Sequence, residues 1–372
     1  MTGGGGASSR KAAGVAALVG PVFLAILVIV LSQRPSGAAF AIAGAILAVV
    51  VVSDVVLIMA RRGVLAAAAL AMDAAVIVLL ATYHAAPLQR PAPFSGALPP
   101  ASPPPEMAAY RIPTGVNHHS AAFGYRGGSF FERRDFTMTA VLVRHPGGDL
   151  LIDSGLSRSI AEQLRLMSLS FRLLTNYELR ASAAEQLDAA GYDRSRLRIL
   201  LTHAHWDHAS GLRDFPNVPI LVTAGELRFI EDAGPYTQIA RSTPNPRYEV
   251  YGFEGGPYLG FPASHDFYGD GSIVAVPTPG HTPGSVIIFV TLPPERRYAF
   301  VGDLVWQLEG IRELEERPWI ARGSDLNPGE VRENLLRMAA VAERFPSMRI
   351  VPAHDSRGFE GLPRFGSGVL PR

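Results

Sequence analysis

Residues 200–211, LLTHAHWDHASG, place three histidines and one aspartate within six consecutive positions. The preceding run RLRILL predicts a short buried strand, so the cluster lies at the C-terminal end of that strand. His203 and His205 are two positions apart and point the same way in an extended chain, where they can bind one metal ion. Asp207 and His208 follow in the predicted turn, face elsewhere and suit a second ion. The cluster therefore requires a rigid framework of strand ends around one site.

Three more strand ends carry side chains that can bind metal: His281 in TPGHTPGS, Asp303 in FVGDLVW and His354 in VPAHDS. The chain contains no cysteine, so only His, Asp and Glu can serve as ligands. The alternative is that these are surface histidines clustered by chance. It requires five of the ten histidines to occupy such contexts accidentally, and we therefore favour a metal site.

The C-terminal two thirds of the chain show a mixed α/β pattern. TAVLVRH and DLLIDSG predict two strands joined by a PGG turn. VPILVTAGEL predicts a strand that leads into a helix, and SIVAVPTPGH, SVIIFVTL and RYAFVGD predict three further strands. NPGEVRENLLRMAAVAERF predicts a helix with Asn327 as its N-cap and Pro328 at its first position. MRIVPAHD predicts the last strand.

These motifs resemble those of the metallo-β-lactamase fold superfamily. THAHWDHASG matches its HxHxDH signature, and the order His281, Asp303, His354 matches its remaining ligands. LLIDSG resembles an early strand end of the same fold. The resemblance covers most of residues 108–360. It implies an α/β fold, an αββα sandwich, with a two-metal centre between its sheets.

The resemblance also implies the role of each residue at this centre. Its ligand set assigns His203, His205 and His281 to a first zinc ion, and Asp207, His208 and His354 to a second, with Asp303 bridging the two ions. Asp153 is not one of these ligands but is expected to orient one of them. The two ions are taken as zinc on the resemblance alone, and iron and manganese stay open as alternatives.

Two divalent ions lower the pKa of a bridging water far enough to leave hydroxide at neutral pH. That hydroxide is expected to attack a carbonyl or phosphoryl centre while one zinc polarises the substrate oxygen. Asp207 and Asp303 are the expected catalytic residues. Either Asp207 or a metal-bound water protonates the leaving group, and the sequence leaves both open.

Departures from individual branches of the superfamily narrow the substrate class. Familiar metallo-β-lactamases either use a cysteine ligand or lack the bridging aspartate, whereas this chain has no cysteine and keeps Asp303. His205 stands where the redox di-iron relatives have a glutamate. Only a short tail follows His354, unlike the glutathione thioesterases. The remaining resemblance is to lactonase-like enzymes, including N-acyl homoserine lactonases. Those place a tyrosine shortly after the bridging aspartate, where this chain has Trp306, which suits either a core aromatic or a pocket wall.

We therefore expect hydrolysis of a lactone or another ester-like small molecule. One alternative is a phosphodiesterase or esterase acting on lipid or envelope material. The other is a membrane sensor that binds metal without turnover. The formal net charge of +1 gives no reason to expect a nucleic-acid partner, and the sequence does not indicate an oligomeric state.

The N-terminal region is far more apolar than the rest. Apolar runs at residues 15–31, 38–60 and 64–82 have about the length that an α-helix needs to cross a bilayer. They predict an all-α region of three transmembrane helices within residues 1–84. Asp54 and Asp73 lie inside the second and third runs, where helix packing is the favoured explanation over a transport role.

Basic residues set the expected orientation. Arg10 and Lys11 precede the first run, and Arg61 and Arg62 separate the second from the third, which indicates a cytoplasmic N-terminus. Three spans then place the hydrolase domain, residues 107–372, outside the cytoplasm. The proline-rich residues 85–106 between the two regions predict an extended, semi-rigid linker.

Overall fold

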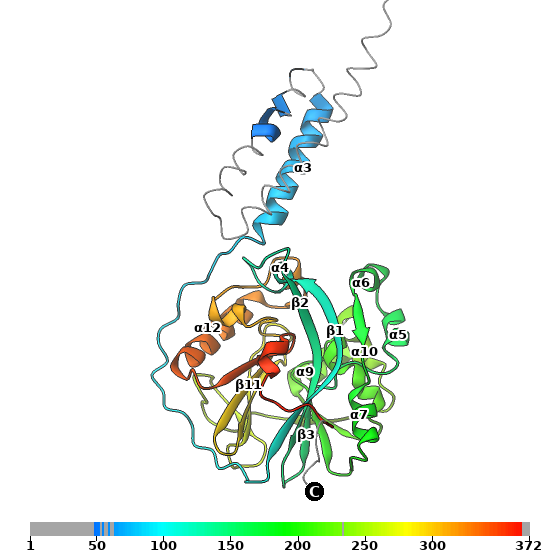
Figure 1. Cartoon of the computed structure of the whole chain (residues 1–372), viewed down its shortest axis with the longest axis vertical. Helices are drawn as coiled ribbons and strands as arrows, with labels where there is room; N and C mark the ends of the chain where they lie inside the picture. The colour runs from blue at the N-terminus through cyan, green and yellow to red at the C-terminus, as the bar shows by residue number, and fades with distance from the viewer. Residues whose placement is uncertain (1–47, 53, 56–58, 60–62, 233, 367–372) are drawn as a thin grey trace, which may run out of the picture. The chain divides into compact units, whose positions relative to one another are not determined.

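The computed structural model describes residues 48–52, 54–55, 59, 63–232 and 234–366 (Figure 1). The chain divides into two compact units, which are described separately. The smaller comprises residues 1–87, 120–132 and 317–321, as far as these are described. The larger comprises residues 88–119, 133–316 and 322–372, again as far as described, and contains every candidate metal ligand.

The first sheet of the larger unit has seven strands in the order β4-β1-β2-β3-β5-β6-β7. Its strands β3, β5, β6 and β7 run parallel, whereas β2 and β3 form the antiparallel pair predicted on either side of the PGG turn. The strand bounds are β1 Ala108–Ser120, β2 Arg133–Arg144, β3 Asp149–Ile152, β4 Tyr177–Leu179, β5 Leu197–Leu200, β6 Pro219–Thr223 and β7 Arg247–Tyr251.

The second sheet has five strands in the order β12-β11-β10-β9-β8. It is also mixed, because β11 and β12 are parallel while the other pairs are antiparallel. The bounds are β8 His265–Asp266, β9 Ile273–Pro277, β10 Val286–Leu292, β11 Arg296–Gly302 and β12 Arg349–Pro352. The three predicted strands of this region correspond to β9, β10 and β11.

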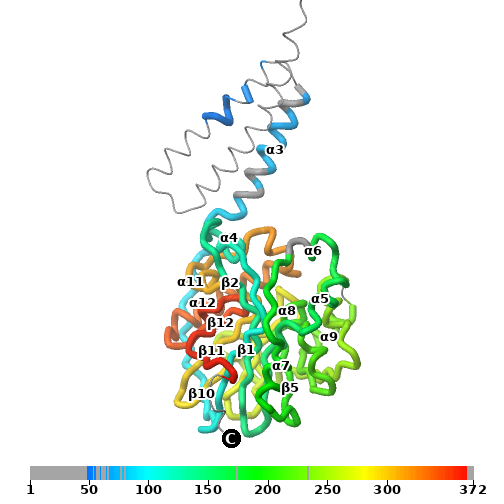
Figure 2. The backbone as a smooth tube through the Cα atoms, turned by 45° about the vertical axis from the view of Figure 1, so that its right-hand side comes forward, coloured from blue at the N-terminus to red at the C-terminus, as the bar shows by residue number. Residues whose placement is uncertain are grey.

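Alternation of side chains along the strands builds the layers. In β2, Val141 and Val143 join the core between the two sheets, whereas Ala140 and Leu142 face the opposite way. That opposite face is covered by α7 (Ala183–Ala189), α9 (Ala224–Asp232) and α10 (Gln238–Arg241). The outer face of the second sheet packs against α12 (Pro328–Arg344), as Figure 2 also shows. The expected αββα sandwich is therefore confirmed.

The N-terminal end of α12 forms as predicted. Asn327 is the N-cap, and its side-chain oxygen accepts hydrogen bonds from the backbone N–H groups of Gly329 and Glu330. Such a cap satisfies donors that the first turn of a helix leaves without an intrahelical partner. Backbone hydrogen bonds from Leu326 to His281 and from Asn327 to Gly280 join this helix start to a loop of the candidate site.

The smaller unit contains α3 (Gly63–Ala81), which coincides with the third expected span. The first expected span, residues 15–31, and most of the second, residues 38–60, lie outside the described residues. Within the part of the chain that the structure describes, no helix combines the length and apolar character that crossing a membrane requires.

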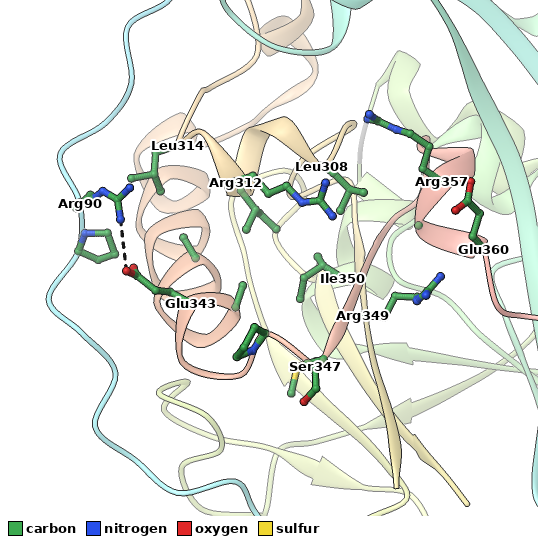
Figure 3. A pocket seen from close by; sticks show the side chains of 17 residues that line it. Arg90, Leu308, Arg312, Leu314, Glu343, Ser347, Arg349, Ile350, Arg357 and Glu360 are labelled. Atoms are coloured by element: carbon green, nitrogen blue, oxygen red, sulfur yellow. Dashed lines mark hydrogen bonds and ion pairs between the residues drawn. The ribbon is translucent and has the colours of Figure 1, made fainter. Parts of the chain in front are cut away.

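The proline-rich segment has the expected irregular, non-helical backbone, but it lies against the larger unit from Leu88 onward. The N–H of Leu88 donates to the Leu314 carbonyl, and Phe94 packs edge-on against Phe345 at 6.1 Å. Arg90 pairs with Glu343 of α12 at 3.4 Å, and both residues line a cavity of about 740 Å³ (Figure 3). This stretch is thus packed along the hydrolase domain instead of extending free of it.

Candidate metal centre

The structure brings all seven expected ligands into one buried cluster. They come from four segments, each following a strand. His203 and His205 follow β5, Asp207 and His208 lie in the short helix α8 (Trp206–Ala209), His281 follows β9, Asp303 follows β11, and His354 follows β12. All seven side chains are at least nine-tenths buried.

Asp303 lies at the centre of the cluster with one oxygen toward each side. Its Oδ2 is 3.4 Å from His281 Nε2 and 3.9 Å from His203 Nε2. Its Oδ1 is 3.3 Å from His208 Nε2 and 3.1 Å from His354 Nε2. One carboxylate therefore faces two separate groups of imidazoles, which is the arrangement expected of a bridging ligand.

Around Asp303 the remaining groups form two sets of donor atoms. On one side, His205 Nδ1 and His281 Nε2 are 2.8 Å apart, and both belong to a set of three imidazoles with His203. On the other side, His354 Nε2 is 3.2 Å from Asp207 Oδ2, and both group with His208. In each set the three donor atoms lie within 4.8 Å of one another.

The hydrogen bonds around Thr202 determine which ring nitrogen of His203 faces the cluster. The Thr202 hydroxyl donates its single proton to Asp153, so it accepts a hydrogen bond from Nδ1–H of His203 at 3.2 Å. The Nε2 atom of His203 is then an unprotonated acceptor, and it is buried without a hydrogen-bond partner among the described residues. A buried nitrogen lone pair in this state fits a metal ligand.

Three other imidazoles are oriented in the same way. His208 Nδ1 lies 2.8 Å from Asp153 Oδ2, which is the position that the resemblance implied for Asp153. His354 Nδ1–H donates to the Thr137 carbonyl at 3.0 Å, and His281 Nδ1 lies 2.7 Å from Asp325 Oδ1. These contacts leave Nε2 of each ring toward the cluster, as in the carboxylate–histidine–metal arrangement.

Burial and charge set the protonation of the cluster without metal. Burial and the neighbouring His208 ring lower the pKa of His203 well below its usual value. Burial opposes ionisation of Asp303, yet the imidazoles of His354 and His208 hold its pKa well below the usual range. The cluster thus combines an ionised central carboxylate with a neutral imidazole, the forms in which both residues bind metal ions.

The sequence did not indicate two supporting carboxylates, Asp325 and Glu226. Glu226 of α9 is almost fully buried and joins two ligand loops. Its Oε1 accepts from the Ala204 N–H at 2.6 Å, between two candidate ligands, and its Oε2 accepts from the Thr282 hydroxyl at 2.6 Å and the Gly284 N–H at 3.1 Å. Burial raises the pKa of Glu226 to about 7, although the three hydrogen bonds act to lower it.

The other histidines lie outside the cluster. His118 and His119 end strand β1, where His118 pairs with Asp135 at 2.7 Å and His119 packs edge-on against Phe136. Phe136 in turn contacts the His354 ring, so His119 is one aromatic contact removed from the cluster. His145 bonds to Asp270 and His265 to Glu254, so both have partners away from the cluster.

The donor set fits a metal centre. Imidazole nitrogens and carboxylate oxygens suit zinc, iron or manganese, and the set offers five imidazoles and two carboxylates. His203, His205 and His281 would hold one ion and Asp207, His208 and His354 the other, with Asp303 shared.

Comparisons with known proteins point to the same chemistry. A probable metallo-hydrolase of Mycobacterium tuberculosis is 30% identical over 229 residues, which cover 58% of this chain and 73% of that protein. The N-acyl homoserine lactonase AttM of Rhizobium radiobacter is 26% identical over 238 residues, covering 60% of this chain and 85% of the lactonase.

A solved N-acyl homoserine lactone hydrolase, with N-hexanoyl-L-homoserine at its catalytic metal centre, superposes with a TM-score of 0.54. At 19% identity it covers 69% of this chain and 96% of its own, and it shows that the two proteins share the sandwich fold. The sequence profile of the metallo-beta-lactamase superfamily matches residues 134–354, from the start of β2 to the last candidate ligand. The chain therefore belongs to the metallo-beta-lactamase superfamily and is a metal-dependent hydrolase.

Proposed function

We propose that this protein is a membrane-anchored hydrolase that uses two zinc ions to open a lactone or cleave a similar small ester. The observation that carries the proposal is the central Asp303 carboxylate, with one oxygen toward each set of imidazoles. The similarity to curated N-acyl homoserine lactonases over most of their length supports a lactone as the substrate class.

When bound, two divalent ions would acidify a water and polarise the substrate carbonyl. The protein supplies the positions of the donor atoms in a buried cluster. Opening a lactone ring releases an alkoxide that must take up a proton. We propose that Asp207 would accept the proton lost by the attacking water and pass it to this alkoxide; its Oδ2 lies 3.2 Å from His354 Nε2.

Aromatic side chains flank the cluster on both sides. The rings of Tyr236 and Phe229 lie 5.9 and 6.1 Å from that of His205, and Trp306 and Phe136 lie 6.0 and 6.5 Å from that of His354. Such walls suit an apolar acyl substituent next to a polar reacting group. They favour an acylated lactone over a small polar ester.

The anchor and the side of the membrane are parts of the same proposal. Three apolar runs before residue 83 and the basic residues between them support a multi-pass anchor with the hydrolase domain outside the cytoplasm. An enzyme held at a membrane meets amphiphilic substrates at raised local concentration, which fits an acylated lactone.

The proposal is tested with the full chain in detergent, loaded with zinc. Acid release in a pH-stat is followed in parallel on a long-chain acyl lactone, a thioester and a phosphodiester. We expect turnover of the lactone, its loss in His203→Ala, and its retention in the matched control His265→Ala, which removes an imidazole outside the cluster. Turnover of the phosphodiester alone would favour envelope or lipid chemistry. Bound metal without any turnover would favour the sensor.

A further inference from the structure

We propose that Trp306 is a positioning residue whose indole N–H fixes the Asp303 carboxylate and thereby sets the affinity of the metal centre. The inference rests on the proposed two-metal function. It assigns a role to a residue that the sequence left open between a core aromatic and a pocket wall.

The contact itself is direct. Trp306 Nε1 donates to Asp303 Oδ2 at 2.8 Å. The same oxygen faces His281 and His203, at 3.4 and 3.9 Å from their Nε2 atoms. The indole therefore occupies one lone pair of this oxygen and leaves the other toward the first set of imidazoles. The second carboxylate oxygen stays turned toward His208 and His354.

The central carboxylate needs such a restraint because it must face two sets of ligands at once. A carboxylate that rotates about its Cβ–Cγ bond moves both oxygens away from their places together. A hydrogen bond from N–H to an ionised carboxylate is among the stronger hydrogen bonds in proteins and favours the ionised form. An indole N–H only donates, so this bond has a single possible direction.

The indole ring is itself held in place. It packs edge-on against the ring of Phe136, with centroids 6.2 Å apart, and against the ring of His354, with centroids 6.0 Å apart. Its neighbours along the chain, Leu304 and Val305, are buried in the core beneath α12. The ring therefore contacts the ligand His354 and also Phe136, whose ring lies next to that of the same ligand.

This geometry also has a consequence for the substrate. Because the only polar atom of Trp306 is directed at Asp303, it is not offered to a substrate oxygen. The residue then contributes to hydrolysis through the metal centre and through the apolar surface of its ring. Replacing the indole should therefore weaken metal binding more than it changes which substrate is preferred.

The test compares the full chain with Trp306→Phe, which keeps an aromatic ring and removes the N–H. Trp319→Phe is the matched control, because Trp319 is 68% exposed. Zinc affinity is measured by competition with a chelator, and the metal-free proteins are compared by thermal unfolding. Loss of an outer partner of a ligand typically weakens metal affinity about 10- to 100-fold. We expect that loss in Trp306→Phe and wild-type affinity in Trp319→Phe.

A double-mutant cycle separates positioning from general damage to the fold. If Trp306 acts through Asp303, then Trp306→Phe should cause little further loss of zinc affinity in an Asp303→Ala background. The same loss in both backgrounds would overturn the inference. So would wild-type affinity in Trp306→Phe, although the proposed function would then stand. Failure of the wild-type chain to bind zinc would reject the proposed function and this inference together.

Discussion

At the level of single residues, three candidate ligands are each directed by a partner that does not face the metal positions. Asp153 holds His208, Asp325 holds His281, and the Thr137 carbonyl holds His354. These partners fix the tautomer and the direction of each ring before a metal arrives. The affinity of the centre should therefore depend on residues outside the ligand set.

Asp325→Ala is predicted to weaken zinc binding about 10- to 100-fold while the ligand set stays complete. The His281 ring loses the carboxylate that holds its Nδ1–H, and the ring becomes free to turn. Chelator competition measures the change. Asp193→Ala, at a fully exposed carboxylate, serves as the control and should bind zinc as the wild type does. Equal affinity in both variants would show that Asp325 does not orient the ligand.

Glu226 should make the stability of the metal-free protein depend on pH. Its pKa is about 7 in the folded protein against an ordinary value of 4.5, so the folded state keeps a proton that the unfolded chain has lost between these values. Its contribution to stability is therefore most favourable below about pH 4.5 and declines until about pH 7. The free energy of unfolding of the metal-free wild type, relative to Glu226→Gln, should fall by on the order of 3 kcal/mol across this window. A difference that does not change with pH would contradict the role of burial.

At the scale of elements, the ligand loops are coupled to one another. Glu226 at the start of α9 binds both the loop after β5 and the loop after β9, and the start of α12 bonds to the latter at Gly280 and His281. A change in one loop is therefore expected to reach ligands on another.

Gly284 gives the sharpest test of this coupling. A Cβ at this position would lie 2.2 Å from the Glu226 backbone nitrogen and 2.3 Å from Thr223 Oγ1. Gly284→Ala must therefore push the loop after β9 away from α9, and we expect lower zinc affinity and a loss of stability of about 1–3 kcal/mol. Gly256→Ala is the control, because a Cβ there meets nothing within 4 Å. Zinc affinity is measured by chelator competition and stability by denaturant unfolding. Equal values for the two variants would contradict the coupling between the loops.

The strands and ligands that the sequence predicted correctly share one local pattern, a short apolar run. Strands β5, β9, β10 and β11 are short apolar runs, and the ligands directly follow such runs. Two of the strands that it missed lack this signal: β7, RYEVY, is mostly exposed at the sheet edge, and β8 has two residues. Strands β1 and β4 were missed as well. Asp325 and Glu226 were missed because they meet their partners 44 and 22 residues away in the chain. Only the fold creates those contacts.

At the scale of the whole molecule, the hydrolase is predicted to be fixed to a membrane by its N-terminal region. The full chain should stay in the membrane fraction after a high-salt and alkaline wash, because burial of several apolar helices resists both treatments. Protease added to intact cells or spheroplasts should reach the hydrolase domain if it lies outside the cytoplasm. Release of the chain by the wash would contradict the anchor. Protection in intact spheroplasts but not in lysed ones would reverse the orientation.

We infer that seven buried residues hold two metal ions around one carboxylate. The most direct measurement is the number of zinc ions bound per full chain at equilibrium, counted by elemental analysis after removal of free metal. We expect two ions in the wild type and fewer in Asp303→Ala, because that carboxylate faces both positions. One ion or none in the wild type, or two in Asp303→Ala, would contradict it.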